Sequence, residues 1–248
     1  MIILLLLFFI TAILYSSVGF GGGSTYLALL LIYDVPYYIF PLIALVSNII
    51  VVSGNSYRYI TAGNYNIKLI IPFLIGSIPF AFLGGTLKIE KFIFEILLFG
   101  VLTVAGILLL LNNKSFEPKR LVIKKLNIFF SLIIGSIIGL ISGIVGIGGG
   151  IFLSPILFLF KAEKPKIIAT TASIFILINS ISAILGHFTK TNILIDLFIY
   201  WPLFLGVLVG GYLGNYLNLK IFSNRTLVIM TSFLVIFVSI RLGIRIFF

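Results

Sequence analysis

Residues 127–160 read NIFFSLIIGSIIGLISGIVGIGGGIFLSPILFLF, an apolar stretch that is interrupted by the cluster Gly146-Ile-Gly-Gly-Gly150. As a helix, residues 127–145 are long enough to cross a hydrocarbon layer about 30 Å thick. Residues 151–160, at about 1.5 Å per residue, are too short to do so. Three consecutive glycines each cost roughly 1 kcal/mol in helix propensity. The pattern therefore predicts a membrane helix that breaks at the glycines and is followed by a half-helix or re-entrant arm.

The same pattern occurs earlier in the chain. Gly19-Phe-Gly-Gly-Gly23 follows the apolar residues 2–18 and precedes the short run 24–33. Three longer apolar segments follow each short run: 39–56, 69–87 and 92–111 in the first half, and 167–186, 193–214 and 226–244 in the second. We expect an all-α polytopic membrane protein of two homologous helical repeats, each with a glycine-broken hairpin plus three longer helices. The predicted domains are a first transmembrane repeat at 1–111, a linker at 112–125 and a second transmembrane repeat at 126–248.

Composition supports a membrane protein and narrows its chemistry. Of the 248 residues, 61% are hydrophobic and 9% are charged, and the mean hydropathy is +1.30. A soluble domain carries about 25% charged residues. With no cysteine, one histidine and six acidic residues, neither a disulfide nor a metal centre is expected, and no cofactor is implied. The net charge of +11 is attributed to basic loops at a lipid bilayer rather than to a nucleic-acid partner.

The basic residues between apolar segments predict the orientation. If each broken hairpin returns to the side on which it starts, the repeats are inverted, and twelve Lys and Arg residues share one face against five on the other. If each hairpin crosses once, the counts are ten against seven. Because positive charge collects on the cytoplasmic side, inverted repeats are favoured. This places the linker 112–125 in the cytoplasm and both termini outside.

Small residues at helical spacing predict close helix contacts. Gly135, Gly139 and Gly143 recur every four residues, as do Gly206, Gly210 and Gly214. Small side chains on one face let two helix backbones approach closely in lipid. We interpret these six glycines as packing residues.

The two glycine clusters suggest a site for an anion. A broken backbone inside hydrocarbon needs polar partners, so it survives only in a packed interior or beside a cavity. Helices that begin directly after the clusters would point their N-terminal amides and positive dipole ends at the breaks. The candidate ligands are Gly21, Gly22, Gly23 and Ser24 in the first copy, and Gly148, Gly149 and Gly150 in the second. A purely structural hinge is the alternative.

Buried polar side chains near the clusters are further candidates. Asn48 and Asn179 stand at equivalent positions inside apolar segments, where an amide either binds a ligand or joins two helices. Thr171 is a candidate hydroxyl donor to an oxyanion. Other hydroxyls in reach are Ser47, Thr170, Ser173 and Ser180. The half-sites differ chemically, because Ser24 follows the first cluster and Ile151 follows the second.

These motifs resemble the sulfite exporter TauE/SafE family of membrane permeases. The similarity rests on the duplicated GxGGG, Pro155, the Lys-Pro pair before Ala169-Thr-Thr-Ala-Ser173, and the equivalent asparagines. It implies transport of small sulfur-containing anions such as sulfite, thiosulfate or sulfonated organic acids. The first half has Phe40-Pro-Leu-Ile instead of the Ala-Thr-x-Ser element, so the resemblance does not imply the same hydroxyl ligands in both halves.

The sequence therefore predicts a multi-pass transporter in the cell (cytoplasmic) membrane that moves a small anion by alternating access around the paired breaks. A passive anion channel and a non-catalytic scaffold subunit are the alternatives. No residues are arranged for catalysis, and an enzyme is not expected. Three ionisable residues near segment ends, Glu95, His187 and Asp196, are interpreted as interfacial. A coupling ion, proton or sodium, and a homo-oligomer are left open.

Overall fold

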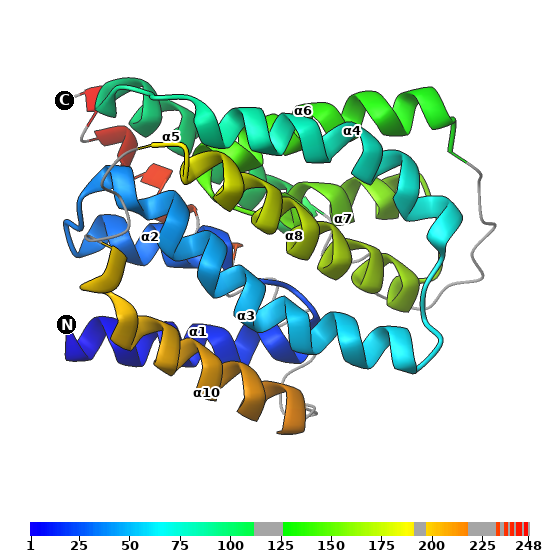
Figure 1. Ribbon diagram of the computed structural model, residues 1–248, viewed down its shortest axis with the longest axis horizontal. Coiled ribbons are helices and arrows are strands. Elements are labelled where there is room, and N and C mark those ends of the chain that lie inside the picture. The colour runs from blue at the N-terminus through cyan, green and yellow to red at the C-terminus, as the bar shows by residue number, and fades with distance from the viewer. Residues whose placement is uncertain are drawn as a thin grey trace.

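The computed structural model describes residues 1–111, 126–190 and 197–217, together with scattered residues between 232 and 247. In these ranges the chain folds into helices and forms no strand. The helices are α1 (Ile2–Val18), α2 (Gly23–Ile32), the short 3-10 helix η1 (Tyr37–Ile39), α3 (Phe40–Thr61), α4 (Ile67–Thr86), α5 (Lys91–Leu111), α6 (Ile128–Val145), α7 (Gly150–Leu159), α8 (Pro165–His187) and α10 (Trp201–Leu217). Figure 1 shows them as one elongated bundle.

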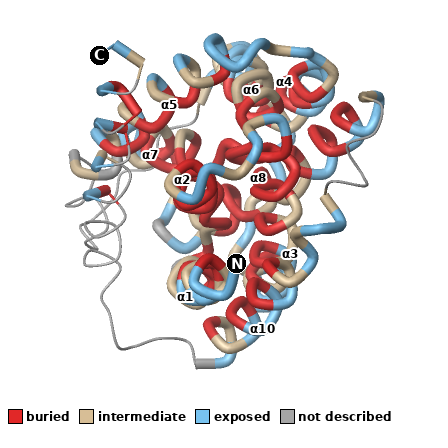
Figure 2. Tube along the Cα trace, turned by 90° about the vertical axis from the view of Figure 1, so that its left-hand side faces the viewer, coloured by how far each residue is buried: buried red, intermediate tan, exposed pale blue. Residues whose placement is uncertain are grey.

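Within the described residues, five segments are long and apolar enough to span a membrane, which confirms the all-α polytopic prediction. They are Tyr37–Thr61, Ile67–Thr86, Lys91–Leu108, Ile128–Val145 and Lys166–His187. Large apolar side chains cover the outside of the bundle, for example Ile75 at 61% exposure and Ile137 at 52%. Buried residues lie along the inner helices α2, α7 and α8 and along the inward faces of neighbouring helices such as α3 (Figure 2). An apolar exterior of this kind is suited to lipid.

Both glycine clusters break the chain as predicted and turn it back on itself. After α1, the ten residues of α2 return toward the end that holds the N-terminus (Figure 1). After α6, the ten residues of α7 follow the second cluster in the same way along the chain. Both short helices are largely buried. Their matched lengths support the repeat hypothesis, which stays a prediction together with its inverted orientation.

The two halves of the chain exchange packing partners. α4 of the first half packs on α6 of the second, α1 packs on α10, and α3 packs on α8. The predicted glycine contacts form these seams: Gly139 of α6 faces the backbone of Ser77, and Gly210 of α10 faces the backbone of Phe9. Helices of the first half are therefore buried partly by contacts with helices of the second half.

Most segment boundaries agree with the sequence prediction, with two differences. α3 extends to Thr61 instead of residue 56, because no glycine or proline lies between residue 56 and Gly63. The segment predicted at 193–214 begins among residues outside the described part; Leu197 and Phe198 are helical, and after a turn α10 begins at Trp201, next to Pro202, a residue tolerated in the first helical turn, and ends at Leu217 instead of residue 214. The linker 112–125 and most of the segment 226–244 lie outside the described residues.

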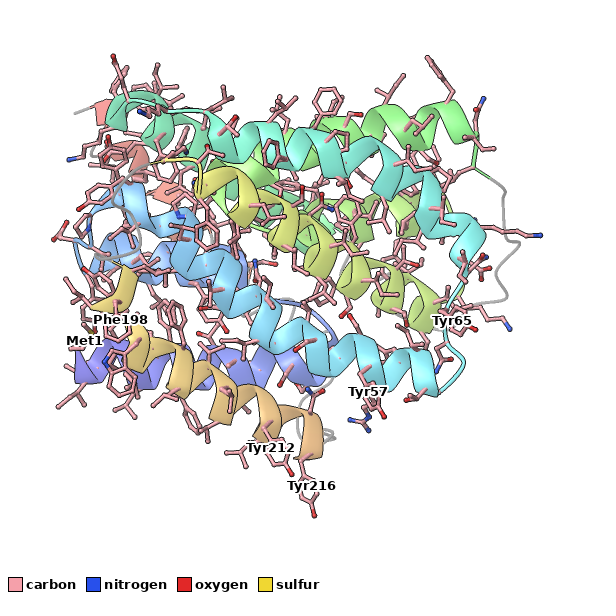
Figure 3. All side chains as sticks on the ribbon, in the orientation of Figure 1. Met1, Tyr57, Tyr65, Phe198, Tyr212 and Tyr216 are labelled. Carbon is pink, nitrogen blue, oxygen red and sulfur yellow. The ribbon has the colours of Figure 1, made fainter. Side chains whose placement is uncertain are left out.

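Exposed tyrosines lie on the outer surface of the bundle. Tyr57, Tyr65, Tyr212 and Tyr216 point away from the helices (Figure 3). Tyr212 and Tyr216 stack on each other with ring centroids 6.5 Å apart. Aromatic rings with a polar tip favour the boundary between lipid and water. These residues are suited to an interfacial belt.

Candidate functional site

Glycines in the left-handed conformation build both helix breaks. Gly19 ends α1 at φ 87°, and Gly146 ends α6 at φ 90°. Gly22 at φ 87° and Gly149 at φ 81° are the N-caps of α2 and α7. Residues with a Cβ rarely adopt this backbone conformation. The duplicated GxGGG is therefore used in the same way twice, to end one helix and to start the next.

Asn48 of α3 joins the two breaks. Its Nδ2 donates a hydrogen bond to the Ile147 carbonyl, at 3.1 Å, and its side chain is completely buried. A Cβ added at Gly23 would lie 2.7 Å from Asn48 Nδ2 and 2.7 Å from the Ile147 carbonyl oxygen. One added at Gly148 would lie 2.9 Å from Asn48 Nδ2. The first and second clusters, far apart in sequence, therefore meet around one side chain.

Free backbone donors lie beside this meeting point. Among the described residues, the N–H groups of Gly21, Gly22, Gly23 and Ser24 find no acceptor, and neither N-cap glycine has a side chain that could supply one. The N–H groups of Gly148–Ile151 are equally free within that part of the chain. Each helix N-terminus carries about half a positive charge. Each buried donor left without a partner costs about 1–3 kcal/mol. Two such ends in one place favour a negatively charged ligand.

The other predicted asparagine is placed differently. Asn179 of α8 is completely buried, but its Nδ2 donates to Phe175 within its own helix, at 2.9 Å. Its Oδ1 has no partner among the described residues. Thr171 also bonds within α8, where its hydroxyl donates to the Ile167 carbonyl at 2.8 Å. The equivalent sequence positions of the two asparagines therefore do not give equivalent contacts.

The hydroxyls near the breaks fall into two groups. Ser47 and Ser180 are buried without a hydrogen-bond partner in the described part of the chain, and Ser180 Oγ would lie 3.1 Å from a Cβ at Gly148. Thr170 bonds within α8, and Ser173 pairs with Ser56 of α3 at 3.0 Å. Ser180 is thus a hydroxyl beside the second break that is free to bind a ligand.

Sequence analysis missed Ile176, which closes the site from α8. Its side chain would lie 3.3 Å from a Cβ at Gly21 and 2.8 Å from one at Gly148. The Ile176 side chain also occupies the space that a Cβ at Gly150 would need. Ile176 precedes Asn179 by three positions, so the two share a helix face, and this spacing was the available signal.

The breaks are closed to solvent in this structure. Residues 21–24 and 145–151 are buried. Pro41 at the start of α3 packs on Gly146, where an added Cβ would lie 2.8 Å from the Pro41 carbonyl oxygen. The described residues hold no group of three His, Cys, Asp or Glu side chains that could bind a metal ion. What the site offers is backbone N–H groups, one amide and a serine.

These features define a class: a polytopic α-helical membrane protein with paired broken helices, the architecture from which many carriers build a binding site within the membrane. The chain belongs to the sulfite exporter TauE/SafE family, whose sequence pattern matches residues 4–242. The resemblance drawn from the glycine clusters is thereby confirmed. The protein is a membrane transporter of this family.

Two relatives are similar over much of their length. "Probable membrane transporter protein y4hK" of Sinorhizobium fredii is 26% identical over 238 residues, which cover 95% of each chain. "Probable membrane transporter protein MJ0441" of Methanocaldococcus jannaschii is 29% identical over 199 residues, covering 77% of this chain and 73% of the relative. No solved structure matches the chain.

Proposed function

We propose that the protein carries a small anion across the cell membrane by alternating access around the paired helix breaks. The substrate class is a sulfur-containing oxyanion such as sulfite or thiosulfate, or a small sulfonated organic acid. The backbone amides of Gly21–Ser24 and Gly148–Ile151 bind the anion. The second N–H of Asn48 Nδ2 adds a donor from the side.

The observation that carries this proposal is the convergence of two helix N-termini at Asn48. Their unpaired N–H groups are donors only, so they suit an acceptor-rich ligand with negative charge. The family name supports a sulfur oxyanion within that class. Asn179 and Thr171 complete the proposed contacts, and each must first leave its hydrogen bond within α8.

Burial of the breaks supports alternating access over an open channel. A channel needs a continuous wet path, whereas residues 21–24 and 145–151 are buried here. The exchanged packing of α1 on α10 and α4 on α6 gives two seams along which the halves could rock. An anion bound at the breaks would reach one side of the membrane at a time.

Transport into proteoliposomes tests the proposal. We would measure uptake of radiolabelled thiosulfate, and its competition by sulfite, sulfoacetate, sulfate, acetate and chloride. Gly149→Val and Gly22→Val should abolish uptake, because both glycines have positive φ and a Cβ at Gly149 would lie 2.7 Å from Ile138. Gly100→Val is the matched control, since nothing lies within 4 Å of its Cβ position.

The outcomes separate the candidate functions. Uptake that saturates, that is competed by sulfur oxyanions and that is lost in the two break variants supports the carrier. Full uptake by correctly inserted Gly149→Val and Gly22→Val protein would overturn the site. Non-saturable flux at channel rates would select the passive channel, and no flux of any anion would favour the scaffold subunit.

A further inference from the structure

A pocket lined by two lysines lies outside the helix breaks, at the end of the bundle that holds the N-terminus. The cavity measures about 270 Å³. It lies where α4 and α8 end and α3 begins (Figure 1). Residues that line it include Lys88, His187, Lys190, Tyr37, Pro41 and Ile144. This volume is large enough for a small oxyanion with some of its water.

The pocket gathers positive charge. Lys88 and Lys190 line it, and within the described part of the chain no Asp or Glu does. The adjoining cavity is different, because Asp34, Lys91 and Glu95 line it together. There Lys91 lies 4.0 Å from Glu95, whose carboxylate offsets part of its charge. Two like charges at one concave site favour an anion between them.

His187 holds Lys190 in place at this pocket. Sequence analysis interpreted His187 as interfacial, but its side chain is only 2% exposed. Its Nε2 lies 2.9 Å from the Gly143 carbonyl, which can only accept, so Nε2 carries the proton. Nδ1 is then an acceptor, and Lys190 Nζ donates to it at 3.2 Å. The lysine keeps two N–H donors for a ligand.

Two residues that line the pocket lie next to the second break. Pro41 lines the cavity and also packs on Gly146, the residue that ends α6. Ile144 lines the cavity two positions before Gly146. A ligand in the pocket is therefore separated from the break by the contact of Pro41 with Gly146.

From this geometry we propose that the pocket is an anion-binding vestibule, in which Lys88 and Lys190 bind a small oxyanion before it reaches the helix breaks. Binding itself depends on the lysine pair. The role as an entry site rests on the proposed transport function. With the orientation that the basic loops predict, the vestibule opens to the outside.

Chemical protection tests binding without requiring transport. Purified full-length protein is treated with acetic anhydride, and acetylation of each lysine is followed by mass spectrometry, with thiosulfate, sulfate or acetate present at constant ionic strength. At about ten times its Kd, the anion should slow acetylation of Lys88 and Lys190 about tenfold by mass action. Lys91, which already pairs with Glu95, is the internal control.

Two variants separate this proposal from the proposed function. Protection of Lys88 and Lys190 should persist in Gly149→Val, which is expected not to transport. In proteoliposomes, Lys88→Gln with Lys190→Gln should raise the thiosulfate KM severalfold at unchanged kcat, and Lys91→Gln should not. Absence of protection by every anion, or equal protection of Lys91, overturns the vestibule even if transport is normal. A lower Tm with unchanged KM would overturn it too, since the lysines would then only neutralise helix C-termini.

Discussion

Asn48 Nδ2 donates a hydrogen bond to the carbonyl oxygen of Ile147, a residue 99 positions further along the chain, at 3.1 Å. Asn48 lies in the middle of α3, and Ile147 lies inside the second glycine cluster. The same side chain contacts the positions of Gly21 and Gly23 in the first cluster. One buried amide therefore holds both breaks together.

Asn48→Ala should weaken both folding and transport. It removes the bond to Ile147 and leaves a buried carbonyl without its partner, which costs about 1–2 kcal/mol. We expect a lower Tm in detergent and a large loss of thiosulfate uptake. Thermal unfolding and proteoliposome uptake of the same preparation measure the two effects.

Asn179→Ala is the matched control for that variant. Because Asn179 Nδ2 donates to Phe175 of its own helix and not to either break, its loss should leave the two breaks joined. We expect a smaller fall in Tm than for Asn48→Ala. If the two variants lose equal stability, the bond from Asn48 to Ile147 is not what joins the breaks.

Gly21→Ala should act through Asn48. A Cβ at this position would clash with Asn48 Oδ1, although the backbone φ of Gly21 is not positive. We expect Gly21→Ala to reduce uptake strongly in the native background and to cost much less in Asn48→Ala protein, where the clash is gone. A double-mutant cycle on Tm and uptake measures this coupling.

Gly100→Ala provides the reference for Gly21→Ala. Gly100 lies within α5, and its Cβ position is open, so alanine should leave Tm unchanged or raise it slightly through helix propensity. Strictly additive effects of Gly21→Ala and Asn48→Ala would contradict the predicted contact.

Gly139→Leu should disrupt the seam between α4 and α6. A Cβ at Gly139 would collide with the Ser77 backbone, because it would lie 2.8 Å from the Ser77 Cα. Because backbone cannot move aside as a side chain does, we expect a loss of several kcal/mol and poor membrane yield. Ile137→Leu, on the exposed face of the same helix, should have no effect on either yield or Tm.

Thiosulfate affinity should fall as the pH rises through about 8. Burial, and then the nearby Lys88 charge, lower the pKa of Lys190 to about 8. Below that pH Lys190 is a cation and attracts the anion, and above it the side chain is neutral and the attraction is lost. Thiosulfate stays a dianion throughout, so its KM should rise between about pH 7 and pH 9 because of the protein.

Lys190→Gln isolates the group responsible. The other titratable side chains at the pocket are Lys88, His187, Tyr37 and Tyr38, and all of them remain in this variant. The rise in KM should disappear in Lys190→Gln protein. An equal rise in the variant would assign the titration to another group.

Local features of the sequence were sufficient for the membrane class and the helix breaks. Triple glycines and apolar run lengths act through neighbouring residues, so α2 and α7 begin within a residue of their predicted positions, 24 and 151. The spacing of Gly135, Gly139 and Gly143 indicated a packing face for the same reason.

Tertiary packing alone decided which residues meet. No local pattern links Asn48 to Ile147, Gly139 to Ser77 or Lys190 to His187, because each pair depends on how whole helices dock. The same reason separates Asn48 from Asn179, whose sequence positions are equivalent but whose partners differ. The sequence by itself determined where the chain breaks and that it lies in a membrane; the docking of α3 and α8 decided that the two breaks share one site.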